Sequence, residues 1–237
     1  MELPTTVHLP AASPAHHQSL LMLSVEGSST WAARPVPDGL APGGVLRWGS
    51  EPAFAAILQH RPAMILLNAP ATEVDVLTRL VRAACLIAPV ALLRQDRADA
   101  VAALDAGACD VLDSRAQPVE LVWRIRADLR RCPPTASAPA CPSGTASQRL
   151  LFDVLARSRA VVCCHELRLL LGTPAMPITL RALKARIKRL EPAFRQQGLD
   201  LVVDQQWGLA TYRTQARTST GASGQTDGTS AAAPTEP

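Results

Sequence analysis

Short apolar runs alternate with amphipathic stretches along the first half of the chain. The runs are four to six residues long, which is typical of strands that are buried on both faces of a sheet. We predict five such strands, at Leu20–Val25, Val45–Trp48, Ala63–Leu67, Pro89–Leu93 and Cys109–Leu112. Because helical stretches separate these strands, the pattern predicts an α/β domain with a doubly wound, five-stranded parallel sheet.

Between the strands, apolar residues recur at the spacing of a helix. The predicted helices are Glu51–His60, Thr72–Leu86, Asp96–Ala106 and Pro118–Arg131. Thr72 is expected to cap the second helix, and Gly107 is expected to end the third. The segment Gly27–Gly44 is rich in Pro, Gly and Ser, so we expect the first crossover to be poorly formed.

The composition of the chain then suggests its domain boundaries. Residues 132–146 are rich in Pro, Ala and Ser and are predicted to form a linker. Helical periodicity returns at Ser147–Arg157 and Cys163–Leu171, with a brief extended piece between them. We therefore predict an arm at 1–18, an α/β domain at 19–131, the linker, a second domain at 147–213 and a tail at 214–237. Both ends are predicted to be disordered.

The second domain contains a basic amphipathic stretch at Pro177–Leu190, which we predict to be a helix. Pro177 suits a first helical turn, and Pro192 disfavours continuation beyond Leu190. A strand at Leu199–Val203, a turn at 204–208 and a strand at Leu209–Tyr212 follow. A winged helix-turn-helix presents a basic helix and a hairpin of this kind to DNA, although ordinary solvated basic helices share the pattern.

Charge is unevenly distributed along the chain. The net charge is +4, yet residues 148–213 hold eleven Lys and Arg against five Asp and Glu, a net +6. This asymmetry indicates that the second domain meets a polyanion. No apolar run approaches the roughly 20 residues that a membrane span needs, and no signal peptide is evident, so we expect a cytoplasmic protein.

The six cysteines do not form paired Cys-x-x-Cys motifs, so no zinc site is predicted. We expect Cys85 and Cys109 to pack as small apolar residues. Cys132 and Cys141 flank the predicted linker, and a redox-active pair there is an open alternative.

In the order Ala106–Val111, Pro118–Val122, Leu151–Arg157, Val161–Leu167 and Thr179–Leu190, the chain resembles a response regulator of the OmpR/PhoB type, which has a receiver domain followed by a winged helix. The segment Ala106–Val111 with Pro118–Val122 resembles the end of a receiver domain. Leu151–Arg157 with Val161–Leu167 resembles the first helices of the winged helix, and Thr179–Leu190 resembles its recognition helix. The resemblance covers most of 20–212, and it implies a receiver-like domain at 19–131 and a DNA-binding domain at 147–213.

The resemblance fails where the receiver carries its chemistry. Asn68 stands at the phosphoacceptor position, and an amide cannot act as the nucleophile there. The acidic pair that holds Mg²⁺ is reduced to Glu26, Arg94 replaces the expected Thr or Ser, and Ser114 replaces the Lys. We therefore predict a pseudo-receiver that is not phosphorylated and that uses no cofactor and no metal.

The leading hypothesis is a transcriptional regulator that binds promoter DNA in the nucleoid, as a homodimer and with RNA polymerase or another regulator as a further partner. The last helix of the receiver-like domain, with Val119, Val122, Trp123 and Ile125, is a candidate dimer contact. The candidate DNA-binding residues are Thr179, Arg181, Lys184, Ala185, Lys188, Arg189, Gln205, Gln206 and Trp207. The alternative is an adaptor that uses both domains to bind proteins.

We do not expect an enzyme, because the sequence has no Gly-rich phosphate loop and no paired carboxylates after a strand. His165 follows Cys164, but neighbours in a helix point about 100° apart, so the pair does not suggest a shared catalytic site.

Overall fold

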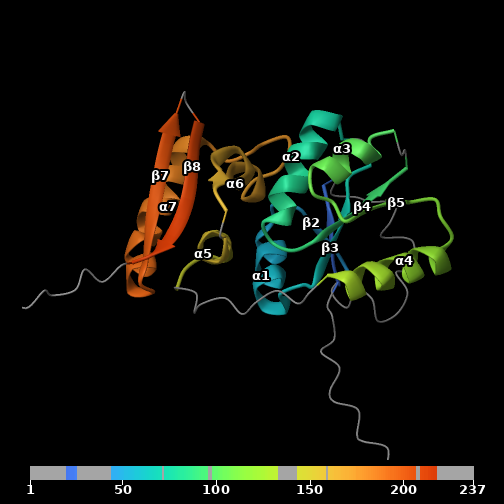
Figure 1. Ribbon diagram of the computed structural model, residues 1–237, viewed down its shortest axis with the longest axis horizontal. Coiled ribbons are helices and arrows are strands. Elements are labelled where there is room, and N and C mark those ends of the chain that lie inside the picture. The colour runs from blue at the N-terminus through green and yellow to red at the C-terminus, as the bar shows by residue number, and fades with distance from the viewer. Residues whose placement is uncertain are drawn as a thin grey trace, which may run out of the picture.

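The computed structural model describes residues 20–25, 44–70, 72–95, 98–132, 143–158, 160–206 and 209–217. These residues form two parts that lie side by side, the N-terminal part (residues 20–132) and the C-terminal part (residues 143–217) (Figure 1). The predicted arm, most of the predicted linker and most of the predicted tail lie outside the described residues. No helix within the described ranges combines the length and the apolar character that crossing a bilayer requires.

The N-terminal part contains a sheet of five strands. They are β1 (Leu20–Ser24), β2 (Val45–Arg47), β3 (Met64–Asn68), β4 (Val90–Arg94) and β5 (Asp110–Asp113). Their order is β2-β1-β3-β4-β5, and every neighbouring pair is parallel. This order belongs to the flavodoxin-like doubly wound folds, so the predicted five-stranded parallel sheet is confirmed.

Helices cover both faces of this sheet. They are α1 (Glu51–His60), α2 (Val74–Cys85), α3 (Ala100–Asp105) and α4 (Pro118–Arg131). Alternate strand residues explain the two layers: Leu21 and Leu67 pack with α1, α2 and α3, whereas Met22 and Leu66 pack with α4. In Figure 1, α4 accordingly lies across the sheet from α1 and α2.

Two local expectations for these helices need correction. The residue at the N-cap of α2 is Glu73, and the helix begins at Val74 without a cap from Thr72. The third helix begins at Ala100, later than the predicted Asp96. Gly107 follows α3 with a φ of 108°, a conformation that favours glycine, as expected for a residue that ends a helix.

The C-terminal part combines three helices with a small sheet. Its elements are α5 (Ala146–Arg157), β6 (Val162–Cys163), α6 (Cys164–Leu170), α7 (Leu180–Gln196), β7 (Leu199–Gln206) and β8 (Leu209–Ala216). The strands are antiparallel in the order β6-β8-β7. Phe152 of α5 stacks on Phe194 of α7 with ring centroids 4.7 Å apart, and Tyr212 of β8 is buried beside them in the same core.

The basic helix begins and ends later than the sequence suggested. The Thr179 hydroxyl accepts a hydrogen bond from the Ala182 N–H at 3.1 Å and so sets the start of α7, leaving Pro177 in the preceding loop. The helix then continues through Pro192 to Gln196. A proline inside a helix removes one backbone hydrogen bond. The free energy gained by burying Phe194 offsets that loss.

The two parts share one hydrophobic core. Helix α5 packs against α1, and α6 packs against α2, so that apolar residues of both parts form a single cluster. The buried indole of Trp48 donates a hydrogen bond to the Leu169 carbonyl at 3.0 Å across this contact. The buried carboxylate of Asp153 pairs with Arg61 of the N-terminal part at 3.4 Å and with Arg157 at 2.6 Å. The parts are therefore docked on each other through apolar contacts, a hydrogen bond and an ion pair.

Candidate nucleic-acid interface

One face of α7 points away from the protein and is basic. Leu183, Ile187 and Leu190 are buried against the core of the C-terminal part, as the apolar stripe predicted. Most of the side chains between them face solvent because positions one or two residues away from a buried position lie on other faces of a helix. The exposed residues of this face are Arg181, Lys184, Ala185, Lys188 and Arg189.

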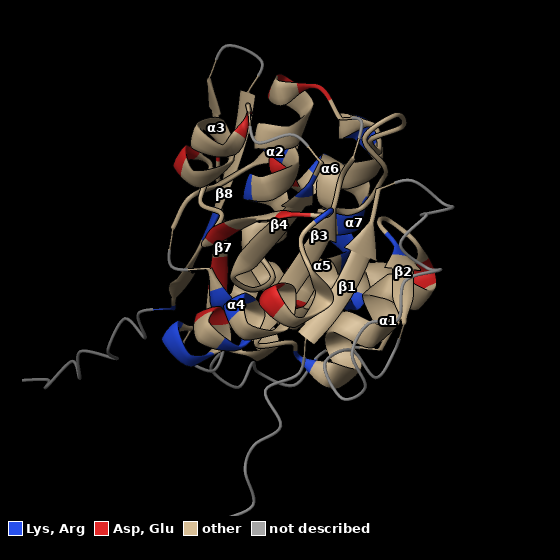
Figure 2. Cartoon of the chain, turned by 90° about the vertical axis from the view of Figure 1, so that its right-hand side faces the viewer, with Lys and Arg blue, Asp and Glu red and all other residues tan. Residues whose placement is uncertain are grey.

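The positive charges of this basic face are not neutralised locally. Arg181, Lys184, Lys188 and Arg189 form no ion pair with another described residue. The first acid of α7 is Glu191, which pairs with Arg195 at 3.9 Å near the far end of the helix. By contrast, α4 carries both basic and acidic side chains along its length (Figure 2). The N-terminal two-thirds of α7 therefore present cations that are free to meet an anionic partner.

Arg186 lies outside this face. The sequence left open an ion pair between Arg186 and Glu191, and the structure does not contain it, because Glu191 pairs with Arg195 instead. The Nη1 atom of Arg186 is buried and has no hydrogen-bond partner among the described residues.

The hairpin of β7 and β8 ends near the start of α7. Strand β7 and helix α7 are neighbours that run in opposite directions, so the end of β7 and the start of β8 lie on the same side as the first turn of α7 (Figure 1). Gln205 and Gln206 are exposed, but they belong to β7 and pair with Ala210 and Leu209, whereas the sequence placed them in the turn. Trp207 lies outside the described residues.

The hairpin strands are longer than expected because their pairing register continues. Residues Leu201 and Thr214 are partners, and the ladder extends to Leu199 with Ala216. The second strand thus ends at Ala216, beyond the predicted domain boundary at 213.

Asn68 lies where the resemblance places the phosphoacceptor, at the carboxyl end of β3. Its side chain is buried, and its Nδ2 donates a hydrogen bond to the Ser24 hydroxyl at 3.5 Å. Glu26 lies outside the described residues. Within the ranges the structure describes, no three His, Cys, Asp or Glu side chains form a group that would hold a metal ion.

Arg94 closes this edge of the sheet with its own positive charge. The side chain is buried, and Nη1 donates hydrogen bonds to the carbonyls of Ala69 at 2.6 Å and of Pro70 and Thr72 at 3.2 Å. Nη2 forms an ion pair with Asp99, in the turn before α3. The guanidinium therefore bonds the two loops that follow β3 and β4 and holds them together. Arg115, the other base at this edge, is largely exposed and pairs with Asp113 at 3.3 Å.

Replacing Arg94 with methionine should lower the free energy of unfolding by about 2–4 kcal/mol, because three carbonyls and a partly buried carboxylate lose their partner. Arg94→Lys keeps the positive charge, so it should lower the free energy of unfolding by less than Arg94→Met does. Some loss should remain because lysine lacks the planar fork that bonds several partners at once. Urea denaturation of the full chain measures both values. Equal stability of Arg94→Met and the parent chain would contradict the structural role of Arg94.

Three cysteine thiols of the N-terminal part are protected rather than activated. Cys85 packs partly buried against the core as expected, and burial raises its pKa to about 11. Cys109 is exposed as a residue, contrary to expectation, but its thiol lies 3.1 Å from the Val90 carbonyl, and desolvation raises its pKa to about 12. Desolvation also raises the pKa of the buried Cys132, and Cys141 lies outside the described residues. These thiols are protonated at neutral pH, which disfavours thiolate chemistry.

Comparison with known proteins gives structural likenesses at low identity. No family model matches the chain, and no curated protein matches its sequence. The chain is similar to the signal receiver domain of the response regulator NarL from Mycobacterium tuberculosis, at 19% identity over 48% of this chain and 97% of that one, with a TM-score of 0.34. It is also similar to a member of a family of redox sensors in the streptococci that evolved from two-component response regulators. That likeness has 16% identity over 73% of this chain and 88% of the other, with a TM-score of 0.27.

Proposed function

We propose that the chain is a DNA-binding transcriptional regulator of the OmpR/PhoB type whose C-terminal part is a winged helix-turn-helix. The order of elements supports this proposal, since a helix, a short strand, two helices and a hairpin follow one another. The short strand β6 pairs with the last strand β8, which ties the hairpin to the helices. In this arrangement α7 is the recognition helix and the hairpin is the wing.

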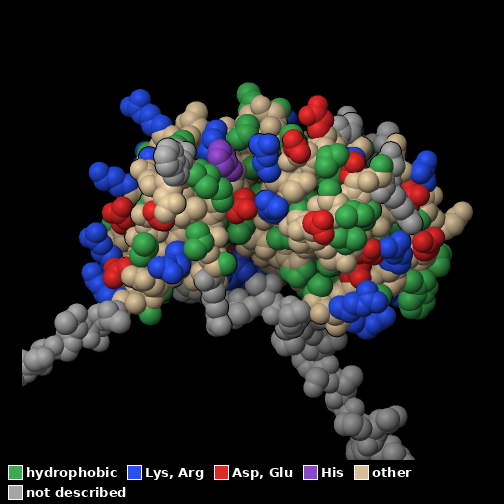
Figure 3. Space-filling model, turned by 45° about the horizontal axis from the view of Figure 1, so that its top comes forward, with side chains coloured by type: hydrophobic (Ala, Val, Ile, Leu, Met, Phe, Trp, Pro, Cys, Tyr) green, Lys and Arg blue, Asp and Glu red, His purple; other side chains and the backbone are tan. Residues whose placement is uncertain are grey.

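The observation that carries the proposal is the unpaired basic face of α7. In a surface helix with no binding role, ion pairs between basic residues and acids at i+3 or i+4 add to the stability of the helix. The basic face of α7 has no such pairs. In Figure 3, Lys and Arg side chains lie along the left edge of the molecule, over the C-terminal part, with Asp and Glu side chains among them. A concentration of unpaired cations on one helix face is the electrostatic pattern expected of a protein that binds a nucleic acid.

The proposed contacts follow from position along α7. Arg181 and Lys184 lie in its first turns, where a recognition helix meets base edges, and arginine can bond guanine with two nitrogens. Lys188 and Arg189 lie farther along and would contact phosphates. Gln205 and Gln206 belong to the wing, and Trp207 follows them in the sequence. A single winged helix binds weakly, so a homodimer on paired half-sites in nucleoid DNA is part of the proposal, with RNA polymerase or another regulator as further partner.

The helix α4 offers a candidate surface for that dimer. Val119 and Trp123 are exposed, and the Arg126 guanidinium lies 5.6 Å from the centre of the Trp123 ring. Ile125 is buried beneath them and Val122 packs on the same core, so these two belong to the fold rather than to the surface.

The N-terminal part, in this proposal, is a receiver-like domain that works without phosphorylation. Asn68 lacks the nucleophilic carboxylate, and Arg94 already places a cation at the edge of the sheet where a receiver would bind Mg²⁺ and phosphate. The N-terminal part then acts through its docking on α5 and α6 and through α4.

Salt dependence and lysine chemistry together test the proposal. Lys184 and Lys188 are the two lysines of the chain, so acetylation with an amine-reactive ester removes charge from the basic face and from the N-terminal amine alone. We expect affinity for a random duplex, measured by fluorescence anisotropy, to fall steeply as salt rises. Acetylation should weaken binding, and bound duplex should protect both lysines from the reagent.

Binding that ignores salt, or lysines that react equally with and without duplex, would contradict DNA recognition by α7. Such a result would favour the adaptor hypothesis, in which the same surfaces bind proteins. If binding behaves as expected, genome-wide mapping of bound DNA followed by footprinting would identify the target promoters.

A further inference from the structure

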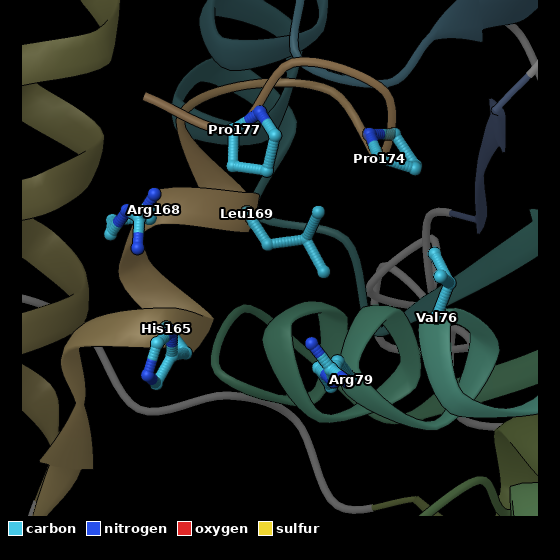
Figure 4. A pocket seen from close by; sticks show the side chains of 7 residues that line it. All are labelled: Val76, Arg79, His165, Arg168, Leu169, Pro174 and Pro177. Carbon is cyan, nitrogen blue, oxygen red and sulfur yellow. The ribbon is translucent and has the colours of Figure 1, made fainter. Parts of the chain in front are cut away.

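A cavity of about 280 Å³ lies where the two parts of the chain meet, between α2 and α6 with the loop that follows it. Its volume is close to the lower end of small-molecule sites, about 300 Å³. Val76 of α2, Leu169 of α6 and the loop residues Pro174 and Pro177 form its apolar wall. Figure 4 shows Leu169 at the centre, between the two prolines and the α2 side. We call it the seam cavity.

The polar side chains of the seam cavity are all basic. Arg79 projects from α2, and His165 and Arg168 belong to α6. Arg79 and His165 lie on the same side of Leu169, opposite the prolines (Figure 4). None of the described residues that line the cavity is acidic.

Two of these basic side chains, Arg79 and His165, have donor groups that are available to a ligand. The side chains of Arg79 and His165 form no hydrogen bond or ion pair with another described residue. Arg168 is half-buried, and its Nε donates a hydrogen bond to the Ile178 carbonyl at 2.7 Å, while the Ile178 N–H donates to the Arg168 carbonyl at 3.2 Å. The guanidinium is thus held in one orientation, and its two terminal nitrogens have no partner among the described residues.

This combination of groups selects the chemistry of a ligand. Two guanidiniums and an imidazole from opposite walls can donate to several oxygens of one anion. A phosphate monoester offers three acceptor oxygens and about two negative charges, whereas a carboxylate offers two oxygens and one charge. The proline and leucine wall accommodates a small apolar group attached to the phosphate.

We propose that the seam cavity binds a small organic phosphate monoester. The phosphate lies between Arg79 and the α6 pair of His165 and Arg168, and the organic group lies against Leu169 and the prolines. Because the ligand touches both parts, its binding energy stabilises their docked arrangement. The loop that forms one wall leads directly to Thr179, the cap of α7. If the proposed function holds, an occupied cavity supplies the regulatory signal that the receiver-like part no longer receives by phosphorylation.

Isothermal titration calorimetry of the full chain with phenyl phosphate tests the site. We expect saturable binding with one site per chain, and binding of inorganic phosphate or of phenol at least tenfold weaker. Arg79→Gln removes a charge that forms no hydrogen bond or ion pair with the residues that the structure describes. The variant should therefore fold normally and bind phenyl phosphate at least tenfold more weakly. Arg82→Gln is the matched control, because Arg82 is exposed on the same helix and does not line the cavity.

Absence of saturable binding would overturn the proposal, as would unchanged affinity in Arg79→Gln or an equal loss in Arg82→Gln. The titration contains no DNA, so its result is independent of the function proposed for α7. Anisotropy with duplex DNA at saturating phenyl phosphate then measures coupling between the sites. A chain that binds phenyl phosphate in the expected way but never binds DNA would contradict the proposed function and leave the seam cavity supported.

Discussion

Replacing Arg181 and Lys184 together with alanine should weaken binding to a specific duplex by at least about 30-fold. Each side chain is worth about 1–3 kcal/mol if it contacts a base edge or a phosphate, and the two lie one turn apart on the exposed face of α7. Neither makes an ion pair with a described residue, so the free energy of unfolding should change by less than about 0.5 kcal/mol. Anisotropy at fixed salt measures affinity, and urea denaturation checks the fold.

A matched variant separates a local contact from a general loss of positive charge. Arg82→Ala with Arg130→Ala removes the same two charges from exposed positions on α2 and α4. This control should lose less than about threefold in affinity, because charges far from the duplex are largely screened beyond roughly 10 Å of solvent. An equal loss in both double variants would show that DNA is attracted by net charge and that α7 is not the contact.

Replacing Gly49 with alanine should destabilise the chain by about 2–5 kcal/mol and loosen the docking of the two parts. Gly49 follows β2 with a φ of 74°, and a Cβ atom there would lie 2.0 Å from the carbonyl oxygen of Gly172, after α6. This oxygen belongs to the backbone, so it cannot move out of the way by rotation as a flexible side chain would. The unfavourable φ adds roughly 1–2 kcal/mol. Urea denaturation measures the loss of stability, and hydrogen exchange of the Trp48 indole N–H, which bonds the Leu169 carbonyl, measures the docking.

Gly198→Ala controls for the backbone conformation. Gly198 has a φ of 67°, close to that of Gly49, but a Cβ there would have nothing within 4 Å. Its cost should therefore be limited to roughly 1–2 kcal/mol. If the two variants lose the same stability, the close approach of Gly49 and Gly172 does not exist in solution.

The sequence predicted the sheet well because its strands are buried on both faces. Runs such as Met64–Leu67 contain no polar residue, so they are easily recognised as buried strands. The observed strands differ from the predicted ones by about one residue at either end. Errors arose where tertiary contacts outweigh local preference. Pro192 suggested a helix end, but the stacking of Phe194 on Phe152 carries α7 beyond it, and no pattern in the sequence foretells that pairing.

The candidate DNA-binding face could be predicted because it needs no information beyond one helix. The burial of Leu183 and Ile187 fixes the orientation of Arg181 and Lys184. The roles of Arg94 and of the seam cavity could not be predicted in the same way. Arg94 binds the carbonyls of Ala69, Pro70 and Thr72. Arg79 and Arg168 line one cavity from two helices that are far apart in the chain. Such sites depend on packing between segments, which a single sequence does not reveal.

The continuous core between the two parts bears on how the chain can be divided. Leu150, Leu151 and Leu170 are completely or almost completely buried in the cluster that also holds residues of α1 and α2. An excised C-terminal fragment would leave these leucines facing water and would be prone to aggregate. We therefore expect the two parts to unfold together as one cooperative unit. A structural change at the parallel sheet would reach α7 through packed side chains of the shared core, without depending on the segment that links the two parts.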